Sequence, residues 1–135
     1  MDDVVIGKVT SIQRCIIRAR QEYAASQDFE NNFTHQDAAI LNVLQACELA
    51  IDLAAYLIRK RKLGIPSESR EAFELLRDAQ LISPQLCQQL VKMVGFRNTV
   101  VHAYQDVNIT VVISVIVSRL DDLLTFTDVV VTLEM

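Results

Sequence analysis

Apolar residues recur at three- and four-residue steps along most of the chain, a spacing that places them on one face of an α-helix. This pattern predicts a first helix over residues 2–26, which ends at a polar break over 28–32. A second helix is predicted from Thr34, which we expect to cap its N-terminus, to Lys62. Residues 63–66 contain the glycine and proline that stop a helix, so the first half of the chain forms two long helices.

Two shorter helices follow, each with its own start signal. Ser67 and Ser69 are candidate caps for the short third helix, which carries Phe73, Leu76 and Arg77. Ser83 and Pro84 start the fourth, because serine caps a helix and proline favours its first position. The apolar stripe of this fourth helix consists of Leu86, Leu90, Met93 and Val94.

The segment from Val107 to Val117 admits two interpretations. Its odd-numbered positions are all apolar and β-branched residues dominate it, which favours a strand. Its polar residues, however, recur at helical steps and continue into the next segment, which a strand does not explain. These polar positions are Thr110, Ser114, Ser118, Asp121, Asp122 and Thr125. We therefore predict one long fifth helix, and with it an all-α bundle of about five helices in a single domain over residues 1–135.

Composition supports a helical chain that associates with a second copy. Hydrophobic residues make up 51% of the sequence and aromatic residues 6%, while three glycines and two prolines are too few for a fold of many hairpins. So large an aliphatic fraction indicates apolar surface buried against another chain. The net charge of −4 argues against a general polyanion-binding protein, which needs clustered lysines and arginines, and no DNA-specific binding is predicted.

The cysteines and the N-terminus indicate the compartment. Cys15, Cys47 and Cys87 are odd in number, widely spaced and set among apolar residues, which is typical of reduced core residues and of neither a disulfide framework nor a metal site. The sequence starts with an acidic pair where a signal peptide would be basic. The longest apolar stretch, 111–117, is too short to cross a bilayer. We expect a cytoplasmic protein with no membrane partner.

The chemistry of the sequence is concentrated between residues 97 and 104. Arg97 supplies a permanent cation, Asn98 an amide, His102 a group that titrates near neutral pH, and Tyr104 a phenol. On an ideal helix Asn98 and His102 share a face, whereas Arg97 and His102 lie about 140° apart, from five steps of roughly 100°. A bend near Gly95 would let the long arginine side chain reach the imidazole. By themselves, an arginine and a histidine at a helix end fit a structural role equally well.

Three further polar residues lie on the second helix. His35, beside the expected cap, is interpreted as a surface residue at a helix start. Glu48 and Asp52 are four residues apart, so they share one face among apolar neighbours, and we treat them as candidate supporting carboxylates. Two such carboxylates are usually exposed to solvent, but their apolar setting also fits a buried partner such as an arginine.

The segment 93–104 resembles the signature of HepT-like toxins, a branch of the HEPN domain superfamily. That superfamily is marked by an arginine and a histidine a few residues apart, and here four residues separate Arg97 from His102. The HepT branch adds an asparagine directly after the arginine and a tyrosine two positions after the histidine, which Asn98 and Tyr104 match. Further similarity is found in the segments 46–54 and 73–76.

The resemblance implies a metal-independent endoribonuclease, and the motif agrees because it contains no carboxylate or cysteine suited to Mg²⁺ or Zn²⁺. No cofactor is expected. In such a reaction the 2′-hydroxyl of the RNA attacks the phosphorus, with His102 as general acid/base, Arg97 as phosphate clamp and Asn98 as an orienting hydrogen-bond partner. Proton transfer is needed on both sides of the phosphorus, so the resemblance implies a homodimer with a composite site.

The resemblance also implies a partner and a modification. HepT-like toxins are encoded beside a small antitoxin of the MNT nucleotidyltransferase type, which silences the toxin by AMP transfer to the motif tyrosine. That residue is Tyr104 here, where an added nucleotide would occupy the anion site beside Arg97 and repel RNA. Tyr104 has a simpler interpretation as a packing residue with a solvent-facing hydroxyl. The expected partners are an RNA substrate (tRNA or mRNA), the antitoxin and a second copy of the chain.

Two other functions fit the same residues. The first is a non-catalytic HEPN module that binds nucleotide or RNA through Arg97 alone. The second is a scaffold whose role is only to hold the antitoxin. The complete motif from Arg97 to Tyr104 favours the ribonuclease toxin, which is the function we predict.

Overall fold

The computed structural model describes residues 2–135, and the described residues form helices and the turns that join them. In chain order the α-helices are α1 (Asp3–Ala25), α2 (Phe33–Arg61), α3 (Ser69–Asp78), α4 (Pro84–His102), α5 (Ile109–Ser114) and α6 (Leu120–Glu134). Short 3-10 turns lie at Phe29–Asn31 and Tyr104–Asp106, and a π-helical turn at Val115–Arg119 joins α5 to α6. The predicted all-α fold is confirmed, because α5, the π turn and α6 follow one another as one helical segment and leave five helical rods.

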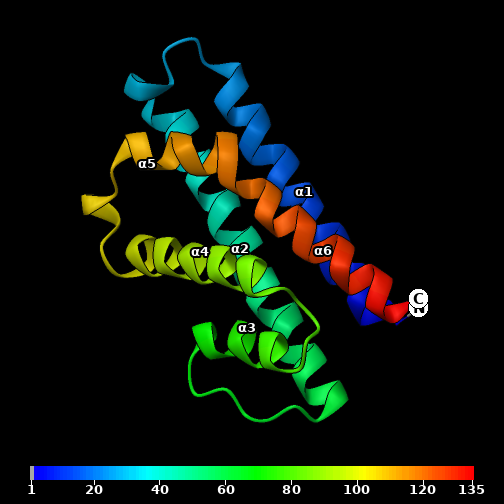
Figure 1. Ribbon diagram of the computed structural model, residues 1–135. Coiled ribbons are helices and arrows are strands. Elements are labelled where there is room, and N and C mark those ends of the chain that lie inside the picture. Colours follow the sequence, from blue (N-terminus) through cyan, green and yellow to red (C-terminus); the bar gives the residue numbers. More distant parts are fainter. Residues whose placement is uncertain (1) are drawn as a thin grey trace.

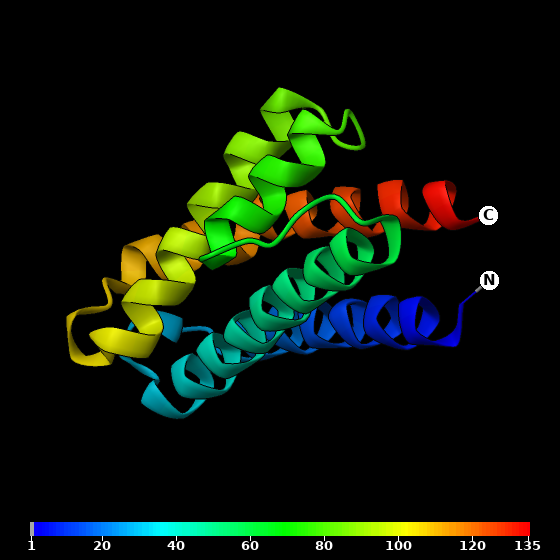
Figure 2. The same cartoon turned by 90° about the horizontal axis from the view of Figure 1, so that it is seen from below.

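The rods form a bundle around α2. Helices α1 and α2 run antiparallel along their length, and α6 returns beside α1, so the two ends of the chain lie together (Figures 1 and 2). Helices α3 and α4 pack on each other and against α2. The α4–α5 connection thus lies at the far end of the bundle from the two chain ends (Figure 1).

A polar cluster fastens the two chain ends to α2. The ammonium of Lys60 lies 3.4 Å from the Asp2 carboxylate and 3.0 Å from the Glu134 carboxylate. The hydroxyl of Tyr56 also donates to Asp2, whose other oxygen accepts the Val4 main-chain N–H at 2.8 Å and caps α1. These contacts join the first and last helices at the end of the bundle where the two chain ends lie together.

Helix α2 is the central helix of the core. Eleven of its residues are buried, and it contacts α1, α3, α4 and α6. By length and hydropathy alone it would also qualify as a membrane-spanning helix. Its buried side chains instead face other helices of the bundle, as expected for the core helix of a globular fold.

The predicted cap of the second helix is wrong by two positions. Asn32, and not Thr34, caps α2, because the Asn32 side chain accepts the main-chain N–H of His35 at 3.1 Å. Asparagine caps a helix at least as well as threonine, and Asn32, at the end of the polar break, comes before Thr34 in the chain.

The start signals of the two shorter helices had different outcomes. Neither Ser67 nor Ser69 caps α3: Ser69 is its first helical residue, and Ser67 donates from its main-chain N–H and its hydroxyl to Glu71, at 3.0 and 2.7 Å. The Glu71 carboxylate, in the first turn of α3, therefore binds the loop that precedes this helix. Ser83 caps α4 as predicted, because its hydroxyl oxygen accepts the Leu86 N–H at 3.0 Å.

The helical interpretation of the last segment is confirmed, but its helix is not uniform. The π turn lets Val115 and Ile116 both enter the core and shifts the helical phase of the residues that follow, because a π turn contains more residues than an α turn. Asp122 was predicted on the polar face, and this prediction is wrong: only 8% of the residue is exposed, whereas Asp121 remains at the surface. The predicted reduced cysteines are confirmed, since Cys15, Cys47 and Cys87 are buried and free.

Candidate active site

The last two turns of α4 carry three of the four motif residues. Arg97, Asn98 and His102 line one open hollow of about 490 Å³, together with Ser69 and Arg70 from the first turn of α3. Helix α4 continues without interruption to His102, so the bend near Gly95 that would bring the arginine to the imidazole is absent from this helix. The three side chains line the same hollow without such a bend.

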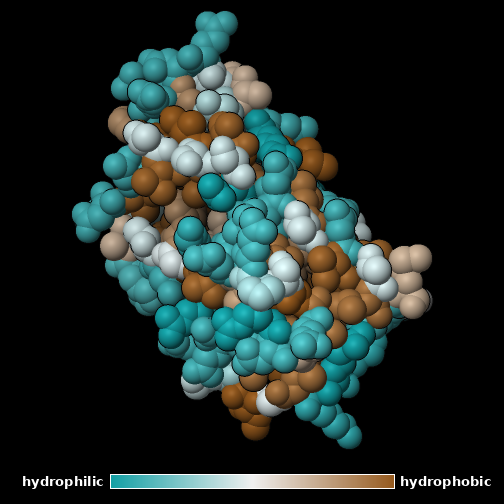
Figure 3. All heavy atoms as spheres, viewed as in Figure 1, coloured by the Kyte–Doolittle hydropathy of each residue, from teal (hydrophilic) through white to brown (hydrophobic). Residues whose placement is uncertain are grey.

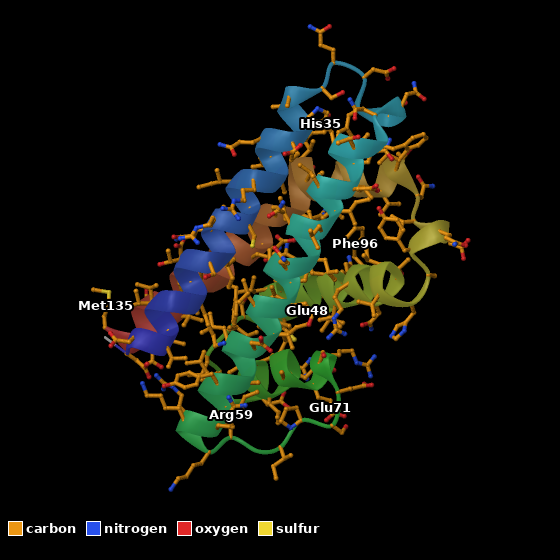
Figure 4. The ribbon with its side chains drawn as sticks, turned by 180° about the vertical axis from the view of Figure 1, so that it is seen from behind. His35, Glu48, Arg59, Glu71, Phe96 and Met135 are labelled. Carbon is orange, nitrogen blue, oxygen red and sulfur yellow. The ribbon has the colours of Figure 1, made fainter. Side chains whose placement is uncertain are left out.

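The guanidinium of Arg97 is held from three sides. Its Nε donates to the carboxylate of Glu48 on α2, one terminal nitrogen donates to Asn98 Oδ1 at 2.6 Å, and the other lies 3.4 Å from the Ser69 hydroxyl. Figure 4 shows Glu48 where α2 crosses α4. A guanidinium has five N–H donors, so these contacts leave one N–H on each terminal nitrogen. That is the arrangement needed to bind two oxygens of a phosphate.

The two carboxylates of α2 have different surroundings. Glu48 has the arginine partner that its apolar setting suggested, although 43% of its side chain is exposed. Asp52 is exposed and, with Arg14 and Arg18 of α1, lines a different hollow that also reaches Glu48. Asp52 therefore faces away from the hollow that contains Arg97, and only Glu48 contacts the motif.

His102 is the last residue of α4 and is exposed at the edge of the hollow. It lies one helical turn beyond Asn98, so the two share a face as the spacing predicts. An exposed imidazole beside a fixed guanidinium has the access to solvent and substrate that proton transfer requires.

The other histidine has a structural setting. His35 lies at the start of α2, as predicted, but its ring is half-buried and its Nδ1 is 2.6 Å from the Glu22 carboxylate of α1. It lies apart from the labelled Glu48 along α2 in Figure 4. His102, and not His35, is thus the histidine that lines the hollow with Arg97 and Asn98.

Tyr104 lies just beyond α4, in the 3-10 turn that leads to α5. Its ring is half-exposed, and its hydroxyl donates to the carboxylate of Asp37 near the start of α2. This hydrogen bond, followed by partial burial, raises the pKa of Tyr104 to about 12. The hydroxyl is therefore not simply solvent-facing: it has a defined carboxylate partner.

The sequence did not predict that three other residues contact the motif or line its hollow: Asp37, Ser69 and Arg70. Each lies in the first two turns of a helix, where polar residues are expected for capping alone. No periodic signal distinguishes such a residue from one that contacts a distant motif. Within residues 2–135, no three histidine, cysteine, aspartate or glutamate side chains gather into a possible metal-binding set.

Comparison with known proteins places this geometry in context. The family model described as Ribonuclease HepT-like matches residues 11–130. The chain is 43% identical over 130 residues to the mRNA nuclease HepT of Shewanella oneidensis, covering 96% of this chain and 98% of that protein. It is 29% identical over 87 residues to the tRNA nuclease HepT of Aphanizomenon flos-aquae, covering 64% of this chain and 59% of that protein.

A solved structure agrees with the sequence match. The tri-AMPylated HEPN toxin of Shewanella oneidensis, in complex with an MNT antitoxin, is similar to this chain with a TM-score of 0.93 and 42% identity. The match covers 98% of this chain and 99% of that one.

Proposed function

The chain belongs to the Ribonuclease HepT-like family, and on this basis we propose that it is the ribonuclease toxin of a toxin–antitoxin pair, with Arg97, Asn98 and His102 as its active site. One observation carries the assignment of the site. Arg97 and His102 line the same open hollow. The arginine is held by Glu48 and Asn98, and one N–H on each of its terminal nitrogens remains available to a substrate. A cation fixed beside an exposed imidazole is what cleavage of a phosphodiester by its own 2′-hydroxyl requires.

Each residue then has a role in the reaction. Arg97 binds the scissile phosphate through its two remaining N–H groups and stabilises the charge that develops on the non-bridging oxygens. Asn98 accepts a hydrogen bond from Arg97 and keeps the guanidinium in position. His102 takes the proton from the 2′-hydroxyl or delivers a proton to the leaving 5′ oxygen. Glu48 supports the arginine, while Asp52 has no part in the site.

The reaction needs proton transfer on both sides of the phosphorus, and one chain brings one histidine to the hollow. We propose that a two-fold homodimer joins two such hollows into one cleft. Exposed apolar residues support this arrangement: Val101 precedes His102, and Val111 and Val117 lie on α5 and the π turn. Hydrophobic side chains gather at the surface over this part of the molecule (Figure 3).

The partner and the regulation follow from the relatives. RNA is the substrate class, because the two nuclease relatives are an mRNA nuclease and a tRNA nuclease. An MNT-type antitoxin is the binding partner, and AMP transfer to Tyr104 is the silencing reaction, supported by the exposed position of this tyrosine two residues after His102. In this proposal residues 1–135 act as one domain in the cytoplasm.

The test is RNA cleavage by the purified protein in EDTA. Wild type is expected to cleave, and His102→Ala to lose about 10²- to 10⁴-fold in rate, the usual contribution of a general acid/base. Arg97→Ala is expected to lose a comparable factor, and Gln88→Ala, an exposed position earlier on α4, to cleave like wild type. Circular dichroism establishes that each variant is folded.

Two outcomes would contradict the proposal. Undiminished cleavage by both Arg97→Ala and His102→Ala would remove the site assignment. RNA binding by wild type without any turnover, unaffected by His102→Ala, would identify a non-catalytic binding module.

A further inference from the structure

The contact between Tyr104 and Asp37 joins two parts of the chain that are 67 residues apart. The tyrosine lies in the turn after α4, and the aspartate lies in the second turn of α2. Both residues are exposed at the surface. The hydrogen bond has the phenol as donor and Oδ1 of Asp37 as acceptor.

Attachment of AMP to a tyrosine requires the phenol to lose its proton. The phenolic oxygen attacks the α-phosphorus of ATP, a new O–P bond forms, the bond from that phosphorus to the bridging oxygen breaks, and pyrophosphate leaves. The proton on the phenolic oxygen must pass to an acceptor as the O–P bond forms. Since Tyr104 has its pKa raised to about 12, its hydroxyl is protonated at neutral pH and does not supply phenolate in advance.

We propose that Asp37 is the proton acceptor for AMP transfer to Tyr104, so that this chain supplies a catalytic residue for its own modification. The proposal rests on the proposed function, in which Tyr104 is the modified residue. Asp37 Oδ1 already accepts the hydrogen bond made by the proton that has to leave, so no rearrangement precedes its transfer.

Other carboxylates are less suited to the task. Glu48 is occupied by the Arg97 guanidinium. Asp106 lies in the same turn as Tyr104, but it lines a separate hollow bordered by α4, α5 and the π turn. Among the ion pairs of residues 2–135, none involves Asp37, so its carboxylate is not committed to a cation. It is therefore the acceptor that geometry and charge both favour.

The modification also ends the contact that promotes it. The phenolic oxygen of tyrosyl-AMP carries no hydrogen to donate, and the attached phosphodiester is an anion beside a carboxylate. The modified side chain consequently separates from Asp37. The protonated carboxyl group then loses its proton to solvent.

The experiment measures the initial rate of AMP transfer from ATP to the full chain by its MNT-type antitoxin, followed by intact mass. Asp37→Asn keeps an acceptor oxygen in place but cannot take a proton, so it is expected to slow transfer by about 10²-fold or more. Its remaining rate should rise about tenfold per pH unit, as transfer to hydroxide does, whereas Asp37→Glu restores part of the rate. Asp106→Asn, in the same turn as Tyr104, is the matched control and should react like wild type.

The outcomes separate this proposal from the one on which it rests. Transfer that is absent from wild type, or undiminished in Tyr104→Phe, refutes modification at Tyr104 and the role of Asp37 with it. Transfer that depends on Tyr104 but is equally fast in Asp37→Asn refutes the role of Asp37 alone. A slower Asp37→Asn with the pH profile of wild type would make the residue a structural support and would also overturn proton transfer to it.

Discussion

The Nε of Arg97 donates to the carboxylate of Glu48, 49 residues earlier in the chain, where α4 crosses α2. This contact occupies the Nε of the guanidinium and leaves its terminal nitrogens to contact Asn98 and Ser69. It also reduces the net positive charge at the proposed phosphate site, so Glu48 both orients the arginine and partly neutralises its charge.

Removal of Glu48 should separate these two effects. Glu48→Ala is expected to lower kcat for RNA cleavage, because the guanidinium becomes mobile, and to lower KM for RNA, because the site becomes more positive. The pair is partly exposed and screened by solvent, so it contributes about 1 kcal/mol or less and the loss in kcat is about fivefold at most. Glu48→Gln, which keeps an acceptor oxygen, should retain more of kcat.

Asp52→Asn is the matched control, since Asp52 lies one turn further along α2 and does not line the Arg97 hollow. Steady-state kinetics on a short RNA gives both constants. An unchanged kcat in Glu48→Ala would show that Asn98 and Ser69 suffice to hold the arginine.

A composite cleft predicts a dominant effect of one inactive subunit. A mixed dimer of wild type and His102→Ala has one imidazole in the shared cleft and lacks one of the two proton-transfer groups. Its activity should fall well below half that of wild type, by about tenfold or more. Two different affinity tags and sequential purification yield the mixed dimer for assay.

The corresponding mixed dimer with Gln88→Ala should be fully active. If the mixed His102→Ala dimer keeps half of the wild-type activity, each subunit has an independent site. A monomer in sedimentation velocity at working concentration would equally contradict the composite cleft.

The buried carboxylate of Asp122 should make stability depend on pH. Burial raises the pKa of Asp122, and although Arg119 lies 3.9 Å away, Oδ2 is buried without a hydrogen-bond partner. Because the pKa is higher in the folded state than in the unfolded state, the folded protein binds more protons between the two values. The contribution of Asp122 to stability is therefore present below about pH 4, the unfolded value, and lost as pH rises through the folded value.

Replacement of the Asp122 carboxylate by a neutral amide tests the predicted direction of this pH dependence. Asp122→Asn should unfold at a higher temperature than wild type at pH 7, and the difference in Tm should shrink as the pH falls toward 4. Asp128→Asn, at an exposed position on α6, should show no such dependence. A variant that is less stable than wild type at pH 7 would mean that the charged form is stabilised by its surroundings.

Two isoleucines on either side of the α2 end allow a matched test of the core. Ile58 is fully buried in α2, whereas Ile65, in the following loop, is 95% exposed. Ile58→Ala should lower the free energy of unfolding by about 2–5 kcal/mol, because it removes buried methyl groups and leaves a cavity. Ile65→Ala should change it by less than about 0.5 kcal/mol. Urea denaturation followed by circular dichroism measures both, and equal losses would contradict the placement of Ile58 in the core.

The elements of this fold could be predicted because they depend on neighbours in the sequence. Helix periodicity depends on residues three and four positions apart, and the Ser83 cap depends on a residue three positions away. The same local reasoning failed at Asn32, where two good capping residues compete within three positions, and at Asp122. There the π turn rotates the helix face, and packing of Val115 and Ile116 into the core accompanies that rotation.

The sequence by itself determined that the chain is helical and that it contains the motif from Arg97 to Tyr104 to which we assign the chemistry, because a short motif and a helical spacing are local properties. Only the tertiary structure decided which residues from other helices contact that motif. Glu48 and Asp52 are indistinguishable by spacing, yet the crossing of α2 and α4 brings one to Arg97 and leaves the other outside the hollow. Asp37 reaches Tyr104 across 67 residues for the same reason: the angle and offset at which two helices pack fix such contacts, and these depend on the whole core.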